Sequence, residues 1–262
     1  MSAAPERRAG VQQAVTVDCR VSEVRHHGSF AVVSLVAPHL ARGAVPGQFV
    51  MVAVPQSGFV LRRPLSLHAV KGDSVALLVE ARGRGSAALA SVDVGQTLSL
   101  AGPLGNGFDT GGVRRALLVG GGIGVAPFQL LADRLAGQGS EVTAAFGFRD
   151  HRQARVTGIF DISQLWVATE DGSLGRRGTA VELAETLTVE PGTVVYACGP
   201  LPMIGAVQRW ADGRGLTGQA SLEAHMACGS GSCHGCVVET TAGYLRVCSE
   251  GPVFDMHTVV VA

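Results

Sequence analysis

Short apolar segments, broken by glycine and proline, recur along the first 108 residues of the chain. They are rich in β-branched residues, alternate with polar positions and follow one another about every ten residues, as short strands joined by tight turns do. The segments are VTVDCRV, FAVVSLV, GQFVMVAV, PLSLHAV, VALLVEA and TLSLAGP. This pattern predicts a small antiparallel β-barrel over residues 1–108.

The pattern changes after Gly112, where strand-like and helix-like segments begin to alternate. The segments are RALLVGG, APFQLLADRLAGQ, EVTAAFGF, LWVATED, TAVELAETL, TVVYACG and PMIGAVQRWADGRG. Such alternation is typical of parallel strands joined by crossover helices. We therefore expect a nucleotide-binding type of α/β domain over residues 109–218.

From Gln219 onward the chain is rich in cysteine and glycine, and we expect a small separate domain over residues 219–262. The predicted fold class is therefore multi-domain β and α/β. It combines an antiparallel β-barrel, a parallel-sheet domain and a small C-terminal domain.

Composition narrows the possible functions. With 262 residues, 36 Gly and 47% hydrophobic residues, the chain is long enough for these domains. A formal net charge of +0 gives no reason to expect nucleic acid or an anionic membrane surface as a partner. No apolar run reaches the roughly 18 residues that span a bilayer. Residues 1–12 lack the apolar core of a signal peptide, so we expect a cytoplasmic protein.

Four cysteines in the last third of the chain carry the most specific chemical signal. Cys228, Cys233 and Cys236 read C-x4-C-x2-C, and Cys248 follows in a separate segment. This is the spacing of a plant-type 2Fe-2S cluster, whose fourth thiolate comes from elsewhere in the chain. Thiolates hold both oxidation states of iron, and the intervening glycine and serine let backbone amides turn toward the sulfurs. The cysteines therefore predict a 2Fe-2S cluster and electron transfer.

Three other interpretations of these cysteines stay open on the sequence alone. Structural zinc sites usually pair two C-x2-C-like hooks, and only Cys233 and Cys236 form one. Disulfides are disfavoured because six cysteines without a signal peptide do not resemble a secreted scaffold. The thiols could also simply pack in a core, as we expect for Cys19. His234 has the wrong spacing for a Rieske ligand.

Two segments of the predicted barrel have features of a flavin site. In Arg62-Arg63-Pro64-Leu65-Ser66, a guanidinium can pair with a pyrophosphate while main chain and hydroxyl face an isoalloxazine ring. Alone, such a turn between strands is more often a solvated edge. About twenty residues further on, Gly83-Arg84-Gly85-Ser86 precedes a helical run, whose free amides and dipole can bind an anion. Together the two segments fit FAD.

A glycine-rich turn predicts a pyridine-nucleotide site in the α/β domain. The strand at residues 116–119 runs into Gly120-Gly121-Gly122-Ile123-Gly124, and we expect Pro127 in the first turn of the next helix. These glycines let a backbone approach a diphosphate, although the spacing is not that of the Rossmann motif and a turn without ligand is the alternative. The turn Cys198-Gly199-Pro200 ends a later strand on the same side. There Cys198 either lies beside a nicotinamide or only packs.

The order of these motifs resembles the ferredoxin reductase superfamily over nearly the whole chain. In detail it is similar to the electron-transfer subunits of type 1B dihydroorotate dehydrogenase. The segments that carry the resemblance are LRRPLS, GPLGNGF, GGGIGVAP, TEDGSLGRRG, CGPLPM and SLEAHMACGSGSCHGC. The family commonly has an aromatic-Arg-Val strand before its phosphate turn. This chain has Val79-Glu80-Ala81 instead, so we expect at most main-chain contacts to FAD there.

The resemblance, with the glycine turns, implies the cofactor contacts residue by residue. For FAD they are Arg63, Pro64, Leu65, Ser66, Val79, Glu80, Ala81, Gly85 and Ser86. For NAD they are Gly120, Gly121, Gly122, Ile123, Gly124, Cys198, Gly199 and Pro200. For the cluster they are Cys228, Cys233, Cys236 and Cys248. We expect no catalytic side chain, because the cofactors carry the chemistry. Glu223 and His225 are candidates for interface or tuning roles, with solvated loop residues as the alternative.

The resemblance also implies a function and a partner. An FMN-containing dihydroorotate dehydrogenase catalytic subunit would supply electrons that pass through 2Fe-2S and FAD to NAD+, in a heterotetramer of two copies of each subunit serving pyrimidine (UMP) biosynthesis. The alternatives are a subunit of sulfide dehydrogenase or of ferredoxin:NAD(P) oxidoreductase, and an iron-sulfur redox sensor. A sensor would not need both a flavin and a nucleotide turn. Between NAD and NADP, Asp150 favours the first and Arg149 the second.

Overall fold

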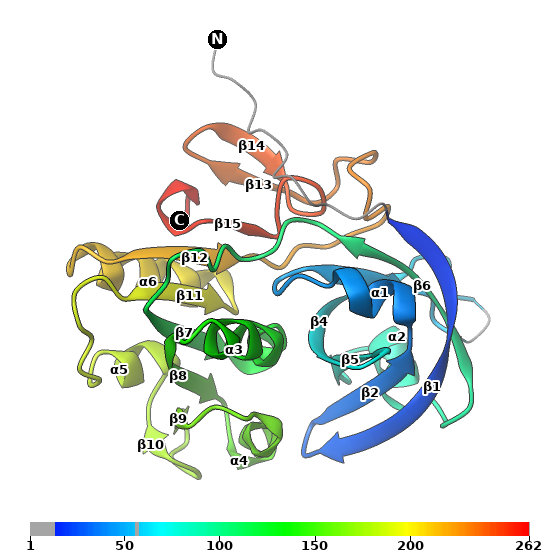
Figure 1. Cartoon of the computed structure of the whole chain (residues 1–262), viewed down its shortest axis with the longest axis horizontal. Helices are drawn as coiled ribbons and strands as arrows, with labels where there is room; N and C mark the ends of the chain where they lie inside the picture. Colours follow the sequence, from blue (N-terminus) through cyan, green and yellow to red (C-terminus); the bar gives the residue numbers. More distant parts are fainter. Residues whose placement is uncertain (1–13, 56–57, 262) are drawn as a thin grey trace.

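The computed structural model describes residues 14–55 and 58–261, and the polar segment expected at residues 1–12 lies outside the described residues. The described residues form a barrel, a sheet domain with helices on both faces, and a C-terminal segment beside both (Figure 1). This arrangement confirms the predicted fold class.

Six short strands build a closed antiparallel barrel in the order β1-β2-β5-β4-β3-β6. They are β1 (Val15–His27), β2 (Phe30–Val36), β3 (Phe49–Val52), β4 (Arg63–Lys71), β5 (Ser74–Glu80) and β6 (Thr97–Leu104), with helices α1 (Pro38–Gly43) and α2 (Arg84–Ala90) between them. Side chains alternate along β2, so Val33 and Leu35 enter the barrel core while Phe30 and Val32 pack against the sheet domain. Cys19 is a buried core thiol, as expected.

A seven-stranded sheet forms the second domain, in the order β10-β9-β8-β7-β11-β12-β15. Its strands are β7 (Arg115–Gly121), β8 (Glu141–Phe148), β9 (Gln164–Thr169), β10 (Arg176–Arg177), β11 (Val194–Cys198), β12 (Thr217–Ser221) and β15 (Val253–Asp255). All neighbours are parallel except β12 and β15. The apolar run of β7 is buried on both faces, which is typical of a parallel sheet.

Helices cover both faces of the sheet. The face toward the barrel carries the short η1 (Gly122–Val125), α3 (Phe128–Gly137), α4 (His151–Ala154) and η2 (Arg155–Ile159). The other face carries α5 (Ala180–Ala184) and α6 (Leu201–Asp212). Along β7, Leu118 therefore faces α3 while Leu117 and Val119 face α5 and α6.

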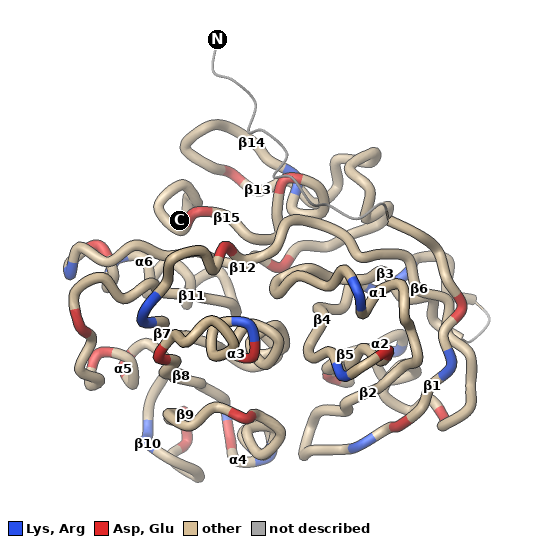
Figure 2. The backbone as a smooth tube through the Cα atoms, in the orientation of Figure 1, with Lys and Arg blue, Asp and Glu red and all other residues tan. Residues whose placement is uncertain are grey.

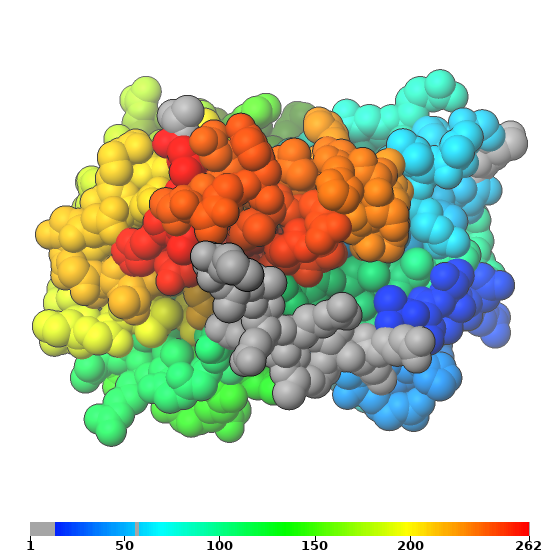
Figure 3. Space-filling model, turned by 90° about the horizontal axis from the view of Figure 1, so that it is seen from above, coloured from blue at the N-terminus to red at the C-terminus, as the bar shows by residue number. Residues whose placement is uncertain are grey.

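The C-terminal segment grows out of the sheet. The expected boundary between residues 218 and 219 falls inside β12, and β15 returns to pair antiparallel with that strand. Between them lie the cysteine-rich loop and a hairpin of β13 (Val237–Thr240) and β14 (Gly243–Arg246), and η3 (Met256–Thr258) follows. Figure 3 shows this segment, orange to red, between the sheet domain and the barrel. The domain limits stay predictions.

Two local expectations are wrong. Arg63-Pro64-Leu65-Ser66 is not a turn between strands but the start of β4, where it pairs with β3. Pro127 is not within the first turn of the next helix. The glycine turn itself forms η1, and Pro127 is the residue that precedes α3.

Charge is spread over the whole molecule. Figure 2 shows acidic and basic residues interspersed in the barrel and in the sheet domain. No helix among the described residues is both long enough and apolar enough to cross a membrane.

Candidate functional site

The four predicted ligand cysteines come together from two segments. Cys228, Cys233 and Cys236 lie in the loop between β12 and β13, and Cys248 follows β14. The side chain of Cys233 contributes to the lowered pKa of Cys228, and the side chain of Cys236 contributes to the raised pKa of Cys248, so the four cysteines interact as two pairs. Within residues 14–55 and 58–261, no three His, Cys, Asp or Glu side chains gather as a site for one metal ion. Two pairs are what a binuclear cluster with two thiolates per iron requires.

Backbone amides point at these sulfurs. Cys228 Sγ accepts hydrogen bonds from the amides of Ser230 and Cys233, both at 3.4 Å. The remaining amide-to-sulfur contacts are Gly235 to Cys233 at 3.4 Å, Gly231 to Cys248 at 3.2 Å and Cys248 to Cys236 at 3.4 Å. These amides lower the pKa of Cys228 to about 5, whereas burial raises the pKa of Cys248 to about 12. Amides aimed at sulfur stabilise an anionic cluster, so the loop fits a 2Fe-2S group.

Left-handed backbone in the loop makes this geometry accessible. Gly229 and Gly231 have φ values of 68° and 82°. His234 has φ 56°, a conformation that costs a non-glycine residue about 1 kcal/mol or more. The small residues between the cysteines therefore allow the backbone to turn around the sulfurs.

The two expected flavin segments lie against each other. Arg63, at the start of β4, places its guanidinium over Gly85 in α2, where an added Cβ would come within 2.7 Å of Nε. Its Nη1 donates to the Leu61 carbonyl at 2.7 Å, and the guanidinium also lies over the Phe59 ring, 5.5 Å from its centroid. Gly85 thus forms a cradle for Arg63, in which a cation and a helix N-terminus meet.

Arg62 has a different environment. Its guanidinium donates to the Ser99 carbonyl at 2.7 Å, to the Ser99 hydroxyl at 3.1 Å and to the Met51 carbonyl at 3.3 Å. These bonds join β3 and β6 within the barrel. Arg62 is therefore a structural residue.

Glu80, which stands where the family commonly has Arg, is already paired. One carboxylate oxygen accepts from Arg82 Nε at 2.5 Å and the other from Gln153 Nε2 at 2.9 Å. The second bond joins the barrel to α4 of the sheet domain. With its carboxylate engaged, Glu80 offers a bound cofactor mainly its backbone.

The two glycine turns of the sheet domain pack against each other. A Cβ on Gly124 would lie 2.3 Å from the Cys198 carbonyl oxygen, and one on Gly121 would lie 2.6 Å from Met203 Sδ. Gly122 differs, because it has φ 56° and its Cβ position meets only Arg82, at 3.7 Å. Gly124 is therefore required by packing against backbone, Gly121 lies against the flexible Met203 side chain, and Gly122 is the glycine whose surface is open toward the barrel.

Cys198 is buried at the end of β11, near the exposed Glu223 of the C-terminal segment. Burial raises the pKa of Cys198, and the nearby Glu223 carboxylate adds to this effect. Desolvation also raises the pKa of Glu223, with Arg82 opposing and Glu80 reinforcing the shift. Cys198 is thus a buried neutral thiol rather than a reactive one.

Asp150, the candidate for discriminating NAD from NADP, caps a helix. Its side chain accepts hydrogen bonds from the amides of Arg152 and Gln153, at 2.8 Å and 3.0 Å. This use explains the aspartate without a ribose contact.

Strand β3 lies between the flavin segment and the cluster loop. Met51 pairs with Pro64 of β4, and Phe49 pairs with Ser66. On the cluster side, a Cβ on Gly229 would come within 2.6 Å of the Met51 side chain, so the residue after Cys228 rests on β3. Cys236 and Cys248 belong to the same buried cluster as Met51. The predicted flavin and cluster sites are therefore direct neighbours.

Known proteins match the chain in this region and beyond. Residues 223–260 match the family described as "Iron-sulfur cluster binding domain of dihydroorotate dehydrogenase B". The "Dihydroorotate dehydrogenase B (NAD(+)), electron transfer subunit" of Caldanaerobacter subterraneus subsp. tengcongensis is 37% identical over 220 residues, covering 82% of this chain and 87% of that protein. The protein of the same name from Bacillus caldolyticus is 40% identical over 226 residues, with the same coverage. The chain belongs to this family of electron transfer subunits.

Solved structures agree with that membership. The NADH-dependent reduced ferredoxin-NADP oxidoreductase superposes with a TM-score of 0.82 at 25% identity, covering 93% of this chain and 90% of that one. The ferredoxin reductase of carbazole 1,9a-dioxygenase gives 0.67 at 26% identity, covering 78% and 67%. The electron transfer subunit therefore has a ferredoxin reductase type of fold.

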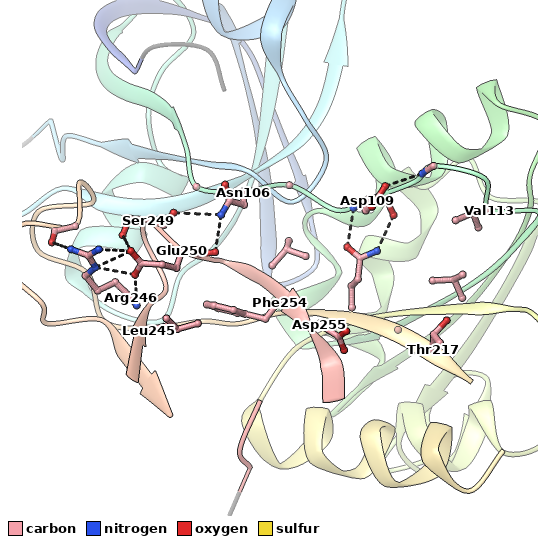
Figure 4. Close-up of a pocket in the computed structure, with 18 of the residues that line it drawn as sticks. Asn106, Asp109, Val113, Thr217, Leu245, Arg246, Ser249, Glu250, Phe254 and Asp255 are labelled. Atoms are coloured by element: carbon pink, nitrogen blue, oxygen red, sulfur yellow. Dashed lines mark hydrogen bonds and ion pairs between the residues drawn. The ribbon is translucent and has the colours of Figure 1, made fainter. Parts of the chain in front are cut away.

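Some site residues escaped the sequence analysis. A cavity of about 880 Å³ lies beside the cluster loop, and Arg246 and Glu250 form one end of it (Figure 4). Asn106, also at this end, donates to the Glu250 carbonyl at 2.7 Å and so ties the barrel to the Cys248 segment. In the sequence, the opposite charges of Arg246 and Glu250, four residues apart on either side of Cys248, were the signal for this ion pair. Arg82 also escaped the sequence analysis; its signal was an opposite charge two residues after Glu80, the last residue of β5.

Proposed function

We propose that this chain carries electrons from an FMN-containing dihydroorotate dehydrogenase catalytic subunit to NAD+. The relatives at 37% and 40% identity are named as electron transfer subunits of the NAD(+)-linked enzyme. In this proposal the chain works with a 2Fe-2S cluster and FAD, in the cytoplasm, and serves pyrimidine biosynthesis.

The observation that carries the proposal is the contact across β3. The cluster loop rests on Met51 through Gly229, and Met51 pairs with Pro64 of the flavin segment. Neighbouring strands lie only about 4.8 Å apart, so the two cofactor sites are separated by little more than one strand. This supports direct transfer between cluster and flavin within one chain.

The chain's own residues bind and orient the cofactors. Cys228, Cys233, Cys236 and Cys248 would together hold the two irons of the cluster. When bound, FAD accepts electrons singly and gives a hydride to NAD+, which is chemistry that no side chain here supplies. Arg63 in its Gly85 cradle would meet the FAD pyrophosphate, and the open surface of Gly122 would meet the dinucleotide.

A second function is favoured by one observation, the fold-level match to the ferredoxin-NADP oxidoreductase. In that case the electron donor would be a small iron-sulfur protein instead of an FMN subunit. The higher identity to the dihydroorotate dehydrogenase B proteins supports the first function.

The test is co-purification followed by an assay of the complex. The chain is expressed together with the FMN-binding catalytic subunit of its own organism, and the two are expected to elute as a heterotetramer of two copies of each. That complex is expected to reduce NAD+ with dihydroorotate, whereas the chain alone is expected to pass electrons only from NADH to an artificial acceptor. A stable complex without dihydroorotate-dependent NAD+ reduction, or no complex at all, would contradict the proposal.

A further inference from the structure

The turn after β14 holds an ion pair beside the fourth ligand cysteine. Arg246 Nε donates to both carboxylate oxygens of Glu250, at 3.1 Å and 2.9 Å, and Nη2 also donates to Glu250. Glu250 in turn accepts the Arg246 amide at 2.7 Å. Both side chains are partly buried, at 33% and 21% exposure. Figure 4 shows them pointing toward each other at the end of the cavity.

The guanidinium also reaches the loop that carries the other three cysteines. Arg246 Nη1 donates to the Gly231 carbonyl at 2.9 Å, and the Gly231 amide donates to Cys248 Sγ at 3.2 Å. A Cβ on Gly231 would meet Ser249 Oγ at 3.0 Å and Arg246 Nη1 at 3.4 Å. Gly231 is therefore held between the two, with its amide aimed at the sulfur.

This connection differs from most of the amide-to-sulfur contacts. The amides of Ser230, Cys233 and Gly235 reach a sulfur of their own loop. The Gly231 amide instead crosses from the loop to a sulfur of the separate fourth-ligand segment. Its orientation depends on how the two segments are joined. The Val247 amide donates to the Cys236 carbonyl at 2.9 Å, and Arg246 adds the contact that reaches Gly231 itself.

We propose that Arg246, together with Glu250, is a positioning residue that fixes the Gly231 amide on Cys248 Sγ and sets the reduction potential of the cluster. A guanidinium close to the ligand sulfurs favours the extra negative charge of the reduced state. The Glu250 carboxylate offsets that cation, so the intact pair is nearly neutral. This inference rests on the cluster proposed at the four cysteines.

The pair predicts shifts of opposite sign. Arg246→Gln leaves the Glu250 carboxylate uncompensated beside the cluster, so the potential is expected to fall. Glu250→Gln leaves the guanidinium uncompensated, so the potential is expected to rise. Each shift is expected to correspond to about tenfold in the one-electron reduction equilibrium, or about 59 mV. Arg246→Lys keeps the charge and is expected to stay near the parent potential.

The experiment is a dithionite titration of the purified holoprotein, followed by EPR, after iron and sulfide content have been measured. Full iron content with potentials that do not move in opposite directions would overturn the inference while leaving the proposed function intact. Loss of the cluster from all three variants would also overturn the inference. Arg246→Lys keeps the charge and is expected to keep the cluster. Absence of a 2Fe-2S cluster from the parent protein would instead overturn the proposed function.

The matched control is an ion pair of the same type away from the cysteines. Arg115 Nε and Glu141 Oε2 lie 3.3 Å apart on β7 and β8 of the sheet domain. Arg115→Gln and Glu141→Gln are expected to leave the potential unchanged. A shift in these variants equal to those at Arg246 and Glu250 would show a general charge effect and overturn the positioning role.

Discussion

Arg62 and Arg63 are adjacent in sequence, but their guanidinium groups have different surroundings. Arg62 donates hydrogen bonds to Ser99 and to the Met51 carbonyl within the barrel. Arg63 makes one short hydrogen bond, to the Leu61 carbonyl, and lies over Gly85 with donors to spare. An R-R-P sequence alone does not show which arginine is available to a phosphate.

This difference predicts distinct results for two alanine variants. Arg63→Ala is expected to lose FAD on desalting while keeping a nearly unchanged melting temperature of the apoprotein, because few internal contacts are removed. Arg62→Ala is expected to lower the stability of the apoprotein by about 1–3 kcal/mol, because the hydrogen bonds from Arg62 to β3 and β6 are lost. Flavin absorbance after desalting and thermal unfolding measure the two effects. Unchanged FAD content in Arg63→Ala would remove this residue from the flavin site.

At the scale of elements, His68 on β4 joins the barrel to the turn between η1 and α3 of the sheet domain. Its Nδ1 lies 2.7 Å from the Ala126 carbonyl and therefore carries a proton, and its ring meets Phe160 edge-on. Only 3% of the residue is exposed. Burial lowers the pKa of His68 from 6.5 to about 4, with the hydrogen bond to Ala126 opposing.

The lowered pKa predicts a loss of stability toward acid. Above pH 6.5 His68 is neutral in both states, so its contribution is complete there. Between pH 6.5 and 4 the unfolded chain binds a proton that the folded chain excludes, so the free energy of unfolding falls by up to about 3 kcal/mol as the pH drops. Urea titrations across this range should show a smaller loss for His68→Asn, which keeps a donor near Nδ1 but does not titrate. Equal slopes for both proteins would contradict this account.

The packed glycine turns give a second prediction at this scale. Gly124→Ala would place a Cβ 2.3 Å from the Cys198 carbonyl, and backbone cannot yield as a side chain can. We expect a stability loss of about 1–3 kcal/mol and weaker NADH binding, measured by thermal unfolding and by fluorescence titration. Gly137→Ala, with open space around its Cβ in α3, is the control and should cost nothing. Equal behaviour of the two variants would show that the turn adjusts freely.

Local sequence patterns predicted most of the helices and strands and the four ligand cysteines. The alternation of apolar residues, the glycines in turns and the spacing of the thiols are all properties of neighbouring residues. These patterns failed where partners are distant in sequence. Nothing near Gly124 in the sequence shows that it packs on Cys198. The Arg246 contact to Gly231 likewise depends on how two segments meet. Such roles follow from tertiary packing, which one sequence does not display.

At the scale of the whole molecule, the C-terminal segment is tied to both domains. Strand β12 leads out of the sheet and β15 returns to it, while Asn106 and Met51 join the segment to the barrel. The cluster loop therefore has a fixed position relative to flavin and nucleotide sites. Electron transfer between cofactors depends on such a fixed distance between them more than on a movement of the protein.

The order of the relay predicts a selective defect in the complex. Cys248→Ser removes one of the four proposed ligand thiolates, so the cluster is expected to be lost, while FAD, which we propose is held by β4 and α2, is expected to be retained. NADH-dependent reduction of ferricyanide requires only FAD and should persist. Dihydroorotate-dependent NAD+ reduction should fall by at least about a hundredfold, because electrons can no longer pass through the cluster to FAD. Iron content, the flavin spectrum and the two assays are measured on one preparation. Cys19→Ala, which alters a barrel-core thiol, is the control and should keep both activities. If Cys248→Ser kept dihydroorotate-dependent activity without iron, electrons would bypass the cluster, and the contact across β3 would have no role in transfer.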